Sequence, residues 1–295
     1  MYGLGYGLGI TQRRGVPYVG PLDGFAGQLY ATSGLCRLLS AYGGPLVRMR
    51  RASDGAETDI GFVEDGGLDV AALLAFAGAS SAYSTLWHDQ TGNGHHGAQA
   101  TGAAQPRLVN AGVLDVGPNG RPALVFSGAQ YLELQSSVGF VRDVAAATYA
   151  AVSRATAASG QSVLATSTTG SAAQARSILA YSPNSTAPVF QARNTDVSTL
   201  TALTGVAVSS GAWTRLIGRA RYAAGGADIA VNGTVNTGAM TPAQNTPIAD
   251  TVVGVRIGQF SSGSLSLTGG MSTVVLAQSA LDIAALNAAL AQVMP

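Results

Sequence analysis

The sequence contains no lysine, so all sixteen of its basic residues are arginine. Fifteen acidic residues oppose them, the formal net charge is +1, and charged residues make up only 11% of the chain. A chain so nearly neutral lacks the basic surface that binds nucleic acid or an anionic membrane, so we expect no nucleic-acid partner. Low charge is instead compatible with a surface packed against neighbouring proteins, as in a homo-oligomer.

Cysteine and long apolar runs are also scarce. Cys36 is the only cysteine, so no disulfide can form within the chain, and a buried, unreactive thiol is expected. No run of eighteen apolar residues occurs, which predicts no membrane insertion. The N-terminal stretch has no preceding positive charge, so we expect no secretory signal. We expect the chain to be synthesised in a bacterial cytoplasm.

Metal-binding patterns are missing as well. His95 and His96 are adjacent, so on a strand they would face opposite sides and would not share a metal. No zinc-type spacing of cysteine and histidine occurs elsewhere. We therefore expect neither a metal nor a cofactor.

Turn residues and short apolar stretches dominate what is present. The chain has 39 glycines and 47% hydrophobic residues, a composition that favours short strands joined by turns. Asn232-Gly233 lies between two such strands and predicts a tight hairpin. Strands are expected at residues 46–51, 123–126, 131–134, 147–154, 162–165, 177–180, 189–192, 213–221, 227–231, 252–257 and 270–277.

Helices are expected at three places, and an arm before them. Apolar spacing predicts a helix within residues 24–42, Asp69 caps a second one at residues 71–76, and a third covers residues 279–293. Residues 1–22 are rich in glycine and proline and predict an extended arm. Its apolar side chains suit docking on a capsid or tail protein, and the anchoring residues would be Tyr2, Leu4, Tyr6 and Leu8.

The most informative stretch is residues 84–96, where a strand ending in Trp87 runs into a polar turn. Asp89 is expected to bind the backbone amides of this turn, while His88 would alternate outward. Trp87 and Trp213 lie in apolar strand patterns and are predicted to be core residues.

With residues 44–54 and 120–126, this stretch resembles the catalytic β-sandwich of α-L-arabinofuranosidase B. It resembles even more closely the laminin-G/concanavalin A-like lectin modules of phage or gene-transfer-agent fibre and spike proteins. The resemblance implies a mainly β fold, a concanavalin A-like antiparallel β-sandwich (jelly roll) with a few short helices, over residues 23–295.

The resemblance to a retaining glycosidase implies hydrolysis only if the two catalytic carboxylates are present in this sequence. The family's nucleophile strand most resembles residues 189–194, which carry no carboxylate, and its acid position falls at Gln259 or Phe260. No catalytic residue is therefore expected, and the function inferred is a virion or phage-like particle protein that binds host-surface or capsular polysaccharide without cleaving it. The carbohydrate-binding residues would be Gln191, Arg193, Asn194, Arg256, Gln259 and Phe260.

Two alternatives remain open at this point. One is a glycoside hydrolase of the arabinofuranosidase type, in which Asp196 supplies a carboxylate two residues after Asn194. The other is a purely architectural fibre subunit that binds only other protein copies.

Overall fold

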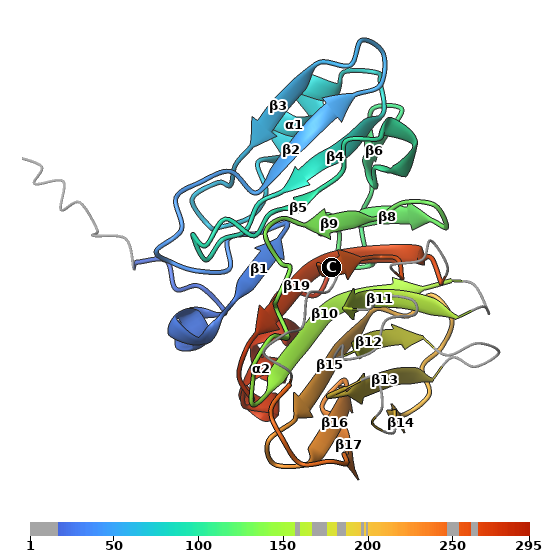
Figure 1. Cartoon of the computed structure of the whole chain (residues 1–295). Helices are drawn as coiled ribbons and strands as arrows, with labels where there is room; N and C mark the ends of the chain where they lie inside the picture. Colours follow the sequence, from blue (N-terminus) through green and yellow to red (C-terminus); the bar gives the residue numbers. More distant parts are fainter. Residues whose placement is uncertain are drawn as a thin grey trace, which may run out of the picture.

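The computed structural model describes residues 17–156, 160–166, 176–181, 187–195, 198, 200–246, 254–260 and 265–295. The chain folds mainly into antiparallel strands, arranged as two facing layers with an upper lobe across their top (Figure 1). The expected sandwich is therefore confirmed. The proposed arm, with Tyr2, Leu4, Tyr6 and Leu8, lies outside the described residues except for residues 17–22.

The back layer is built around β19, which has partners along both of its edges. One edge pairs with β10, and the other is shared by β8 and β1, which follow one another along it. The order is β8 (Leu124–Ser127) and β1 (Ala31–Gly34), then β19 (Thr268–Ala277), β10 (Ala147–Ala155), β15 (Thr214–Arg221), β16 (Gly226–Val231) and β17 (Thr234–Ala239).

The front layer faces the back layer and has six strands, each of which pairs with the next. These are β9 (Leu132–Leu134), β18 (Arg256–Ile257), β11 (Gln161–Thr166), β12 (Arg176–Tyr181), β13 (Pro188–Arg193) and β14 (Thr201–Thr204). At the open end, side chains bridge the two layers: Asn236 donates to the Thr204 carbonyl, and Thr201 donates to the Ala239 carbonyl.

The upper lobe comprises residues 47–114 and joins the layers through β4. This strand pairs with β5, and β5 pairs in turn with β9 of the front layer. It also pairs with β6, and β6 pairs in turn with β8 of the back layer. The lobe contains β2 (Val47–Arg51), β3 (Glu57–Ile60), α1 (Val70–Ala77), β4 (Ala82–Trp87), β5 (Gly97–Ala98), the 3-10 turn η2 (Gly102–Ala104), β6 (Arg107–Asn110) and β7 (Val113–Leu114).

The main core lies between the two layers, where a large ring of one layer packs against both a ring and a glycine of the other. The ring of Phe190 on β13 packs against Tyr149 on β10, with ring centroids 5.8 Å apart. It also lies over Gly218 on β15, where an added Cβ would come within 2.2 Å of the ring. Trp87 and Trp213 are both buried, as predicted.

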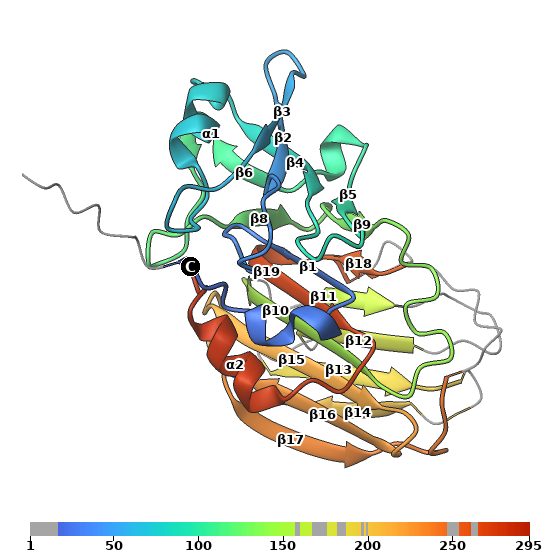
Figure 2. The same ribbon diagram turned by 90° about the vertical axis from the view of Figure 1, so that its left-hand side faces the viewer.

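A second core covers the outer face of the back layer. Helix α2 (Ile283–Ala291) and the 3-10 helix η1 (Asp23–Gln28) lie across this face, as Figure 2 shows. The Asp282 side chain caps α2 by accepting from the Ala285 amide, so the helix begins four residues later than the sequence pattern suggested. Asp69 caps α1 in the same way, as predicted.

The predicted helix within residues 24–42 is wrong. Only η1 is helical there, and residues 31–34 form β1 against β19. The apolar residues spaced along this segment meet different partners, because Leu35 joins the interlayer core while Leu38 and Leu39 join the core under α2. Tertiary pairing thus overrides the apparent helical period. The Asn232-Gly233 hairpin is confirmed, with both residues at positive φ between β16 and β17.

Candidate functional site

The outer face of the front layer carries most of the predicted binding residues. Directly opposed residues on antiparallel strands share a face, so the strand registers place side chains in a continuous row. Reading from the upper lobe to the open end, the row is Ala98, Glu133, Arg256, Ala165, Ile178, Gln191 and Ala202. The strands β5, β9, β18, β11, β12, β13 and β14 thereby contribute one residue each.

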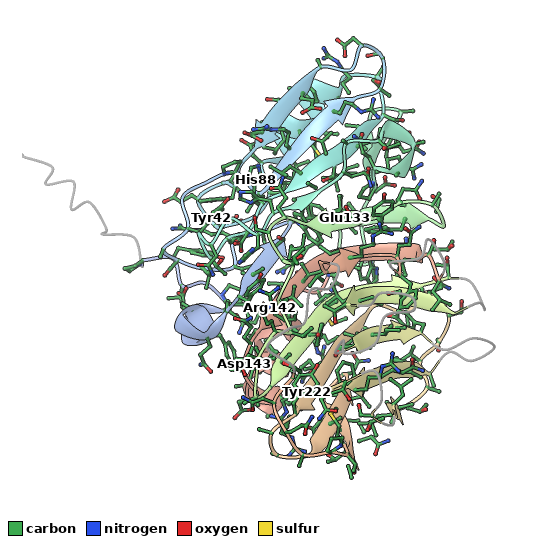
Figure 3. The ribbon with its side chains drawn as sticks, in the orientation of Figure 1. Tyr42, His88, Glu133, Arg142, Asp143 and Tyr222 are labelled. Atoms are coloured by element: carbon green, nitrogen blue, oxygen red, sulfur yellow. The ribbon has the colours of Figure 1, made fainter. Side chains whose placement is uncertain are left out.

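Arg256 is the polar centre of this row. Its guanidinium contacts the Glu133 carboxylate at 2.6 Å and lies over the ring of Tyr131, 4.6 Å from the centroid. Its Nη1 donates to Oε1 of Gln259 at 3.3 Å, and the Gln259 amide donates in turn to Ser266 Oγ at 3.0 Å. Planar groups and fixed polar atoms thus lie side by side, as in sites that bind the faces and hydroxyls of sugars. Figure 3 labels Glu133 where the upper lobe meets the front layer.

Phe260 supplies the apolar part of the same face. Its ring is buried among Ala165, Ile178 and Ala180, with Val189 at the edge of the cluster. These are small or branched side chains, so a small buried apolar cluster lies beside Arg256 on the outer side of the front layer. The structure therefore brings Arg256, Gln259 and Phe260 together.

The three predicted residues on and after β13 lie further along the face. Gln191 is opposite Ile178, and Arg193 is two residues on, opposite Arg176. Asn194 differs from both, because it is fully buried and its amide donates to the carbonyls of Pro242 and Gln244. Its contacts fasten the end of β13 to residues 242–244, whereas Gln191 and Arg193 lie half-buried on the other face of the strand.

The row continues onto the upper lobe, where an ion-pair cluster is found. Arg48 binds both carboxylate oxygens of Asp59, and Asp59 also contacts Nε2 of His88 at 3.1 Å. The hydrogen bond from Arg48 holds the pKa of Asp59 below its usual value, and burial lowers the pKa of His88. His88 does not point outward as predicted: it is buried, and its Nε2 contacts Asp59 on β3.

The Asp89 turn is structural, as the sequence predicted. The buried carboxylate accepts from the amides of Thr91 and His95 within its own turn, and also from the amide of Thr32 on β1. The histidines of this turn have separate roles. His95 stacks on Tyr30, and His96 accepts from the Asp89 amide.

Sequence reasoning missed Tyr131 and Glu133 as members of the site. Tyr131 immediately precedes β9 and Glu133 lies on it, two residues further on, and only the pairing of β9 with β18 brings them to Arg256. The period-2 spacing of the two residues was visible in the sequence, but the partner strand, more than a hundred residues away, was not.

Two features are absent from the described part of the chain. Those residues contain no group of three or more His, Cys, Asp or Glu side chains placed to hold a metal ion. None of the helices found there is long and apolar enough to cross a membrane.

The chain is similar to arabinofuranosidases in sequence. Residues 28–168, slightly under half of the chain, match the family model described as Alpha-L-arabinofuranosidase B, catalytic. An alpha-L-arabinofuranosidase of Hypocrea jecorina is 43% identical over 63 residues, which is 21% of this chain and 13% of that protein. Alpha-L-arabinofuranosidase B of Penicillium canescens is 35% identical over 104 residues, 34% of this chain and 22% of the relative.

Solved structures extend the likeness to nearly the whole chain. An arabinofuranosidase complexed with arabinofuranosyl-alpha-1,2-xylobiose superposes with a TM-score of 0.69 at 17% identity, covering 93% of this chain and 64% of that one. A GH54 arabinofuranosidase soaked with a cyclic sulfate inhibitor gives a TM-score of 0.67, also at 17% identity, over 93% and 65%. At this identity the likeness establishes the fold. The chain spans less than two thirds of these proteins and under a quarter of the two curated relatives.

These findings overturn the functional inference drawn from the sequence. The proteins matched are arabinofuranosidases, so the interpretation as a non-cleaving lectin of a phage, gene-transfer-agent, fibre or spike protein is wrong. The predicted location on a virion or phage-like particle is therefore wrong. The same holds for the predicted partners, which were capsid or tail proteins, host polysaccharide and further copies in a homo-oligomer. The error arose because two short strand motifs were weighed above the segment at residues 28–168.

Proposed function

We propose that this chain is a glycoside hydrolase that acts on arabinofuranosyl groups. The match of residues 28–168 to the arabinofuranosidase B catalytic model carries the proposal. The superposition of 93% of the chain on an arabinofuranosidase supports it, since the two layers outside that segment share the fold as well. The activity is the alternative that the sequence left open.

The substrate would bind on the outer face of the front layer, beside Arg256. An arabinofuranosyl group would meet the Gln259 amide beside Phe260, and Gln191, three strand spacings or about 14 Å away on β13, would contact another part of the substrate. Glu133 holds the Arg256 guanidinium in place and thereby sets its direction over this face. We infer that Arg256 and Gln259 bind substrate, and that Glu133 is a positioning residue.

Strand geometry limits which carboxylates can act together. Glycosidase carboxylates lie roughly 5–10 Å apart. Glu133 on β9 is separated from β13 by four strand spacings, on the order of 19 Å. A carboxylate just after β13 therefore needs a partner other than Glu133.

The acidic residues of the described chain are largely committed to structural contacts. Removing Asp196 and Asp250 from the fifteen acidic residues leaves thirteen in the described part. Examples are Asp115 with Arg107 and Asp228 with Arg219. Asp196 and Asp250 lie outside the described residues, and we propose Asp196 first, then Asp250, as carboxylates of the reaction.

The test is hydrolysis of 4-nitrophenyl α-L-arabinofuranoside by the purified chain, measured as the release of 4-nitrophenol. We expect turnover that falls at least a thousandfold in Asp196→Asn, because an amide neither attacks the sugar nor transfers a proton. Glu133→Gln should raise KM more than it lowers kcat, since it loosens Arg256 and leaves the reacting groups in place.

Asp54→Asn is the matched control, because Asp54 is an exposed partner of Arg51 in the upper lobe. It should retain full activity. Absence of turnover by the unmodified chain on both the aryl substrate and an arabinofuranosyl-xylobiose would contradict the proposed function.

A further inference from the structure

Next to Arg256, the exposed surface of the row lies on the side of the upper lobe. On the other side, the next two members of the row are buried in the apolar cluster of Phe260. Toward the lobe, Glu133 is exposed and Ala98 is half-exposed. A substrate bound beside Arg256 therefore meets open sheet surface across β9 and β5.

The strand registers carry this surface into the lobe. Ala98 on β5 is opposite Leu86 on β4, and Leu86 is opposite Arg48 on β2. All three are half-exposed, and Figure 1 shows their strands in this order between β9 and β3. Arg48 lies four strand spacings from Arg256, about 19 Å along the sheet. A single sugar ring is too short to span this distance, so a ligand that contacts both arginines would be a chain of linked sugars.

A β-bulge on β4 adds a hydroxyl group to the same surface. The pairing of β4 with β2 shifts register between Leu86 and Ser84, so Thr85 is the extra residue. Thr85 and Leu86 are consecutive and both half-exposed, whereas Ser84 and Trp87 on either side of them are buried. Bulges are frequent beside active sites, where they redirect a side chain. Here the bulge breaks the alternation of the strand and brings Thr85 to the outer side together with Leu86.

The Thr85 hydroxyl is only weakly engaged within the protein. Its oxygen lies 3.5 Å from the Arg48 carbonyl oxygen and 3.4 Å from Oε2 of Glu57. Hydrogen bonds between oxygen atoms are usually roughly 2.5–3.0 Å long. The hydroxyl can therefore exchange a long contact for a shorter hydrogen bond to a ligand.

The charges along this surface favour a neutral ligand. Arg48 and Asp59 form a pair without net charge, and Arg256 and Glu133 form another. The exposed Glu57 adds one negative charge, which would repel a sugar chain that carries carboxylates.

We propose that Arg48, Thr85, Leu86 and Ala98 form a lobe subsite, which binds the neutral polysaccharide chain that carries the arabinofuranosyl group. The lobe subsite rests on the proposed function, because the chain would continue from a substrate bound beside Arg256. Thr85 would bond a sugar hydroxyl, and Leu86 and Ala98 would contact the apolar faces of the rings. Binding energy from this remote part of the substrate is gained only with a polymer.

The experiment compares kcat/KM on arabinoxylan, a neutral polymer, with kcat/KM on 4-nitrophenyl α-L-arabinofuranoside, which is too short to reach the lobe. Thr85→Val keeps the side-chain shape and removes the hydroxyl, so it should lower the value on arabinoxylan about threefold to tenfold. Thr85→Arg places a long side chain over the lobe subsite and should lower that value at least tenfold. The value on the aryl substrate should stay unchanged in both variants, which also shows that they fold.

The matched controls are Thr234→Val and Thr234→Arg, at an exposed position on β17 of the back layer. They make the same chemical changes away from the lobe and should leave both values unchanged. A fall in kcat/KM that is equal on the two substrates for the Thr85 variants, or no fall on arabinoxylan in Thr85→Arg, would overturn the lobe subsite.

A binding measurement separates the lobe subsite from the proposed function. Electrophoresis in native gels that contain arabinoxylan should retard the unmodified chain, and Thr85→Arg should remove most of this retardation. Retardation that depends on Thr85 without any turnover would support the lobe subsite and contradict the hydrolase. Retardation that is absent, or unaffected by Thr85→Arg, would overturn the lobe subsite even if the aryl substrate is hydrolysed.

Discussion

At the scale of single residues, Asp89 links parts of the chain that are far apart in the sequence. Its carboxylate accepts from Thr32 on β1 and from two amides of its own turn, so it connects the upper lobe to the back layer. The neighbouring Gln90 does the same for another segment, accepting from the Leu38 amide and donating to the Cys36 carbonyl. The turn is thus a junction between the lobe and residues 32–38.

Replacing Asp89 by alanine should therefore be costly. The Asp89→Ala change leaves buried amides without acceptors and should lower the free energy of unfolding by about 2–4 kcal/mol, since bonds to a charged acceptor are among the strongest. Urea denaturation followed by circular dichroism measures the loss. Asp54→Ala removes an exposed carboxylate and should leave the midpoint where it is; an equal loss in both variants would contradict the role assigned to Asp89.

The burial of His88 makes stability depend on pH. Burial lowers the pKa of His88 in the folded state, so the unfolded chain binds the proton more readily and stability falls as pH drops below about 6.5. The pKa of Asp59 is lowered as well, chiefly by Arg48, so its contribution is lost only below about pH 3.8. Melting temperatures from pH 7.5 to 5.5 should fall, and His88→Gln should flatten this slope. An unchanged slope in the variant would exclude His88 as its source.

Residue-scale prediction from the sequence succeeded where the partners are local. Asp89, Asp69 and the Asn232-Gly233 turn act on amides or dihedral angles within a few residues, and each was recognised. His88 was misplaced because its partner, Asp59, comes from another strand. The chemistry of a side chain is readable from the sequence, whereas a distant partner is not.

At the scale of elements, the close approach of β13 and β15 sets the thickness of the sandwich. Gly218 lies directly under the ring of Phe190, and its neighbours on β15 are larger. The absence of a side chain at this one position lets the ring enter the core and brings the front layer to its observed distance. The proposed binding face on the outer side of β13 is thereby held by packing on its inner side.

Gly218→Ala should destabilise the protein by overpacking. The new methyl group would meet Phe190 at 2.2 Å, which should cost about 1–3 kcal/mol. Gly27→Ala is the matched control, because no atom lies within 4 Å of its added Cβ. Thermal denaturation of both variants and of the Gly218→Ala/Phe190→Leu double variant measures the effect; we expect the double substitution to recover part of the loss, and no recovery would place the strain elsewhere.

The type of an element was predictable where its apolar residues follow a single period. The strands β10, β15, β16 and β19 fall within a residue or two of their expected ranges. The segment at residues 24–42 failed because its apolar side chains divide between two cores on opposite sides of the back layer. For the candidate site, Arg256, Gln259 and Phe260 lie near one another because they are within five residues in the sequence, whereas only the strand pairing brings Glu133 to Arg256.

At the scale of the whole molecule, the upper lobe and the two layers share one hydrogen-bonded network. Main-chain pairing runs from the lobe into the front layer through β5 and β9, and into the back layer through β6 and β8. Separating the lobe from the sandwich would break both connections and expose the core around Trp87. The molecule is therefore expected to unfold as one unit.

The two tryptophans allow a direct test of this unity. Trp87 lies in the upper lobe on β4, and Trp213 immediately precedes β15 in the back layer. In Trp213→Phe the remaining fluorescence reports on the lobe, and in Trp87→Phe it reports on the sandwich. Within each variant, the urea midpoint by fluorescence should coincide with the midpoint by circular dichroism. Two separated midpoints would show that lobe and sandwich unfold independently.

The bridges between β14 and β17 at the open end have a consequence for behaviour at high concentration. A sheet with free edges can recruit a strand from another molecule and grow edge to edge. Here the carbonyls of Thr204 on β14 and Ala239 on β17, the edge strands of the two layers, already accept hydrogen bonds from side chains of the opposite layer. An incoming chain meets acceptors that are engaged, so this rim resists the templated aggregation to which β-rich proteins are prone.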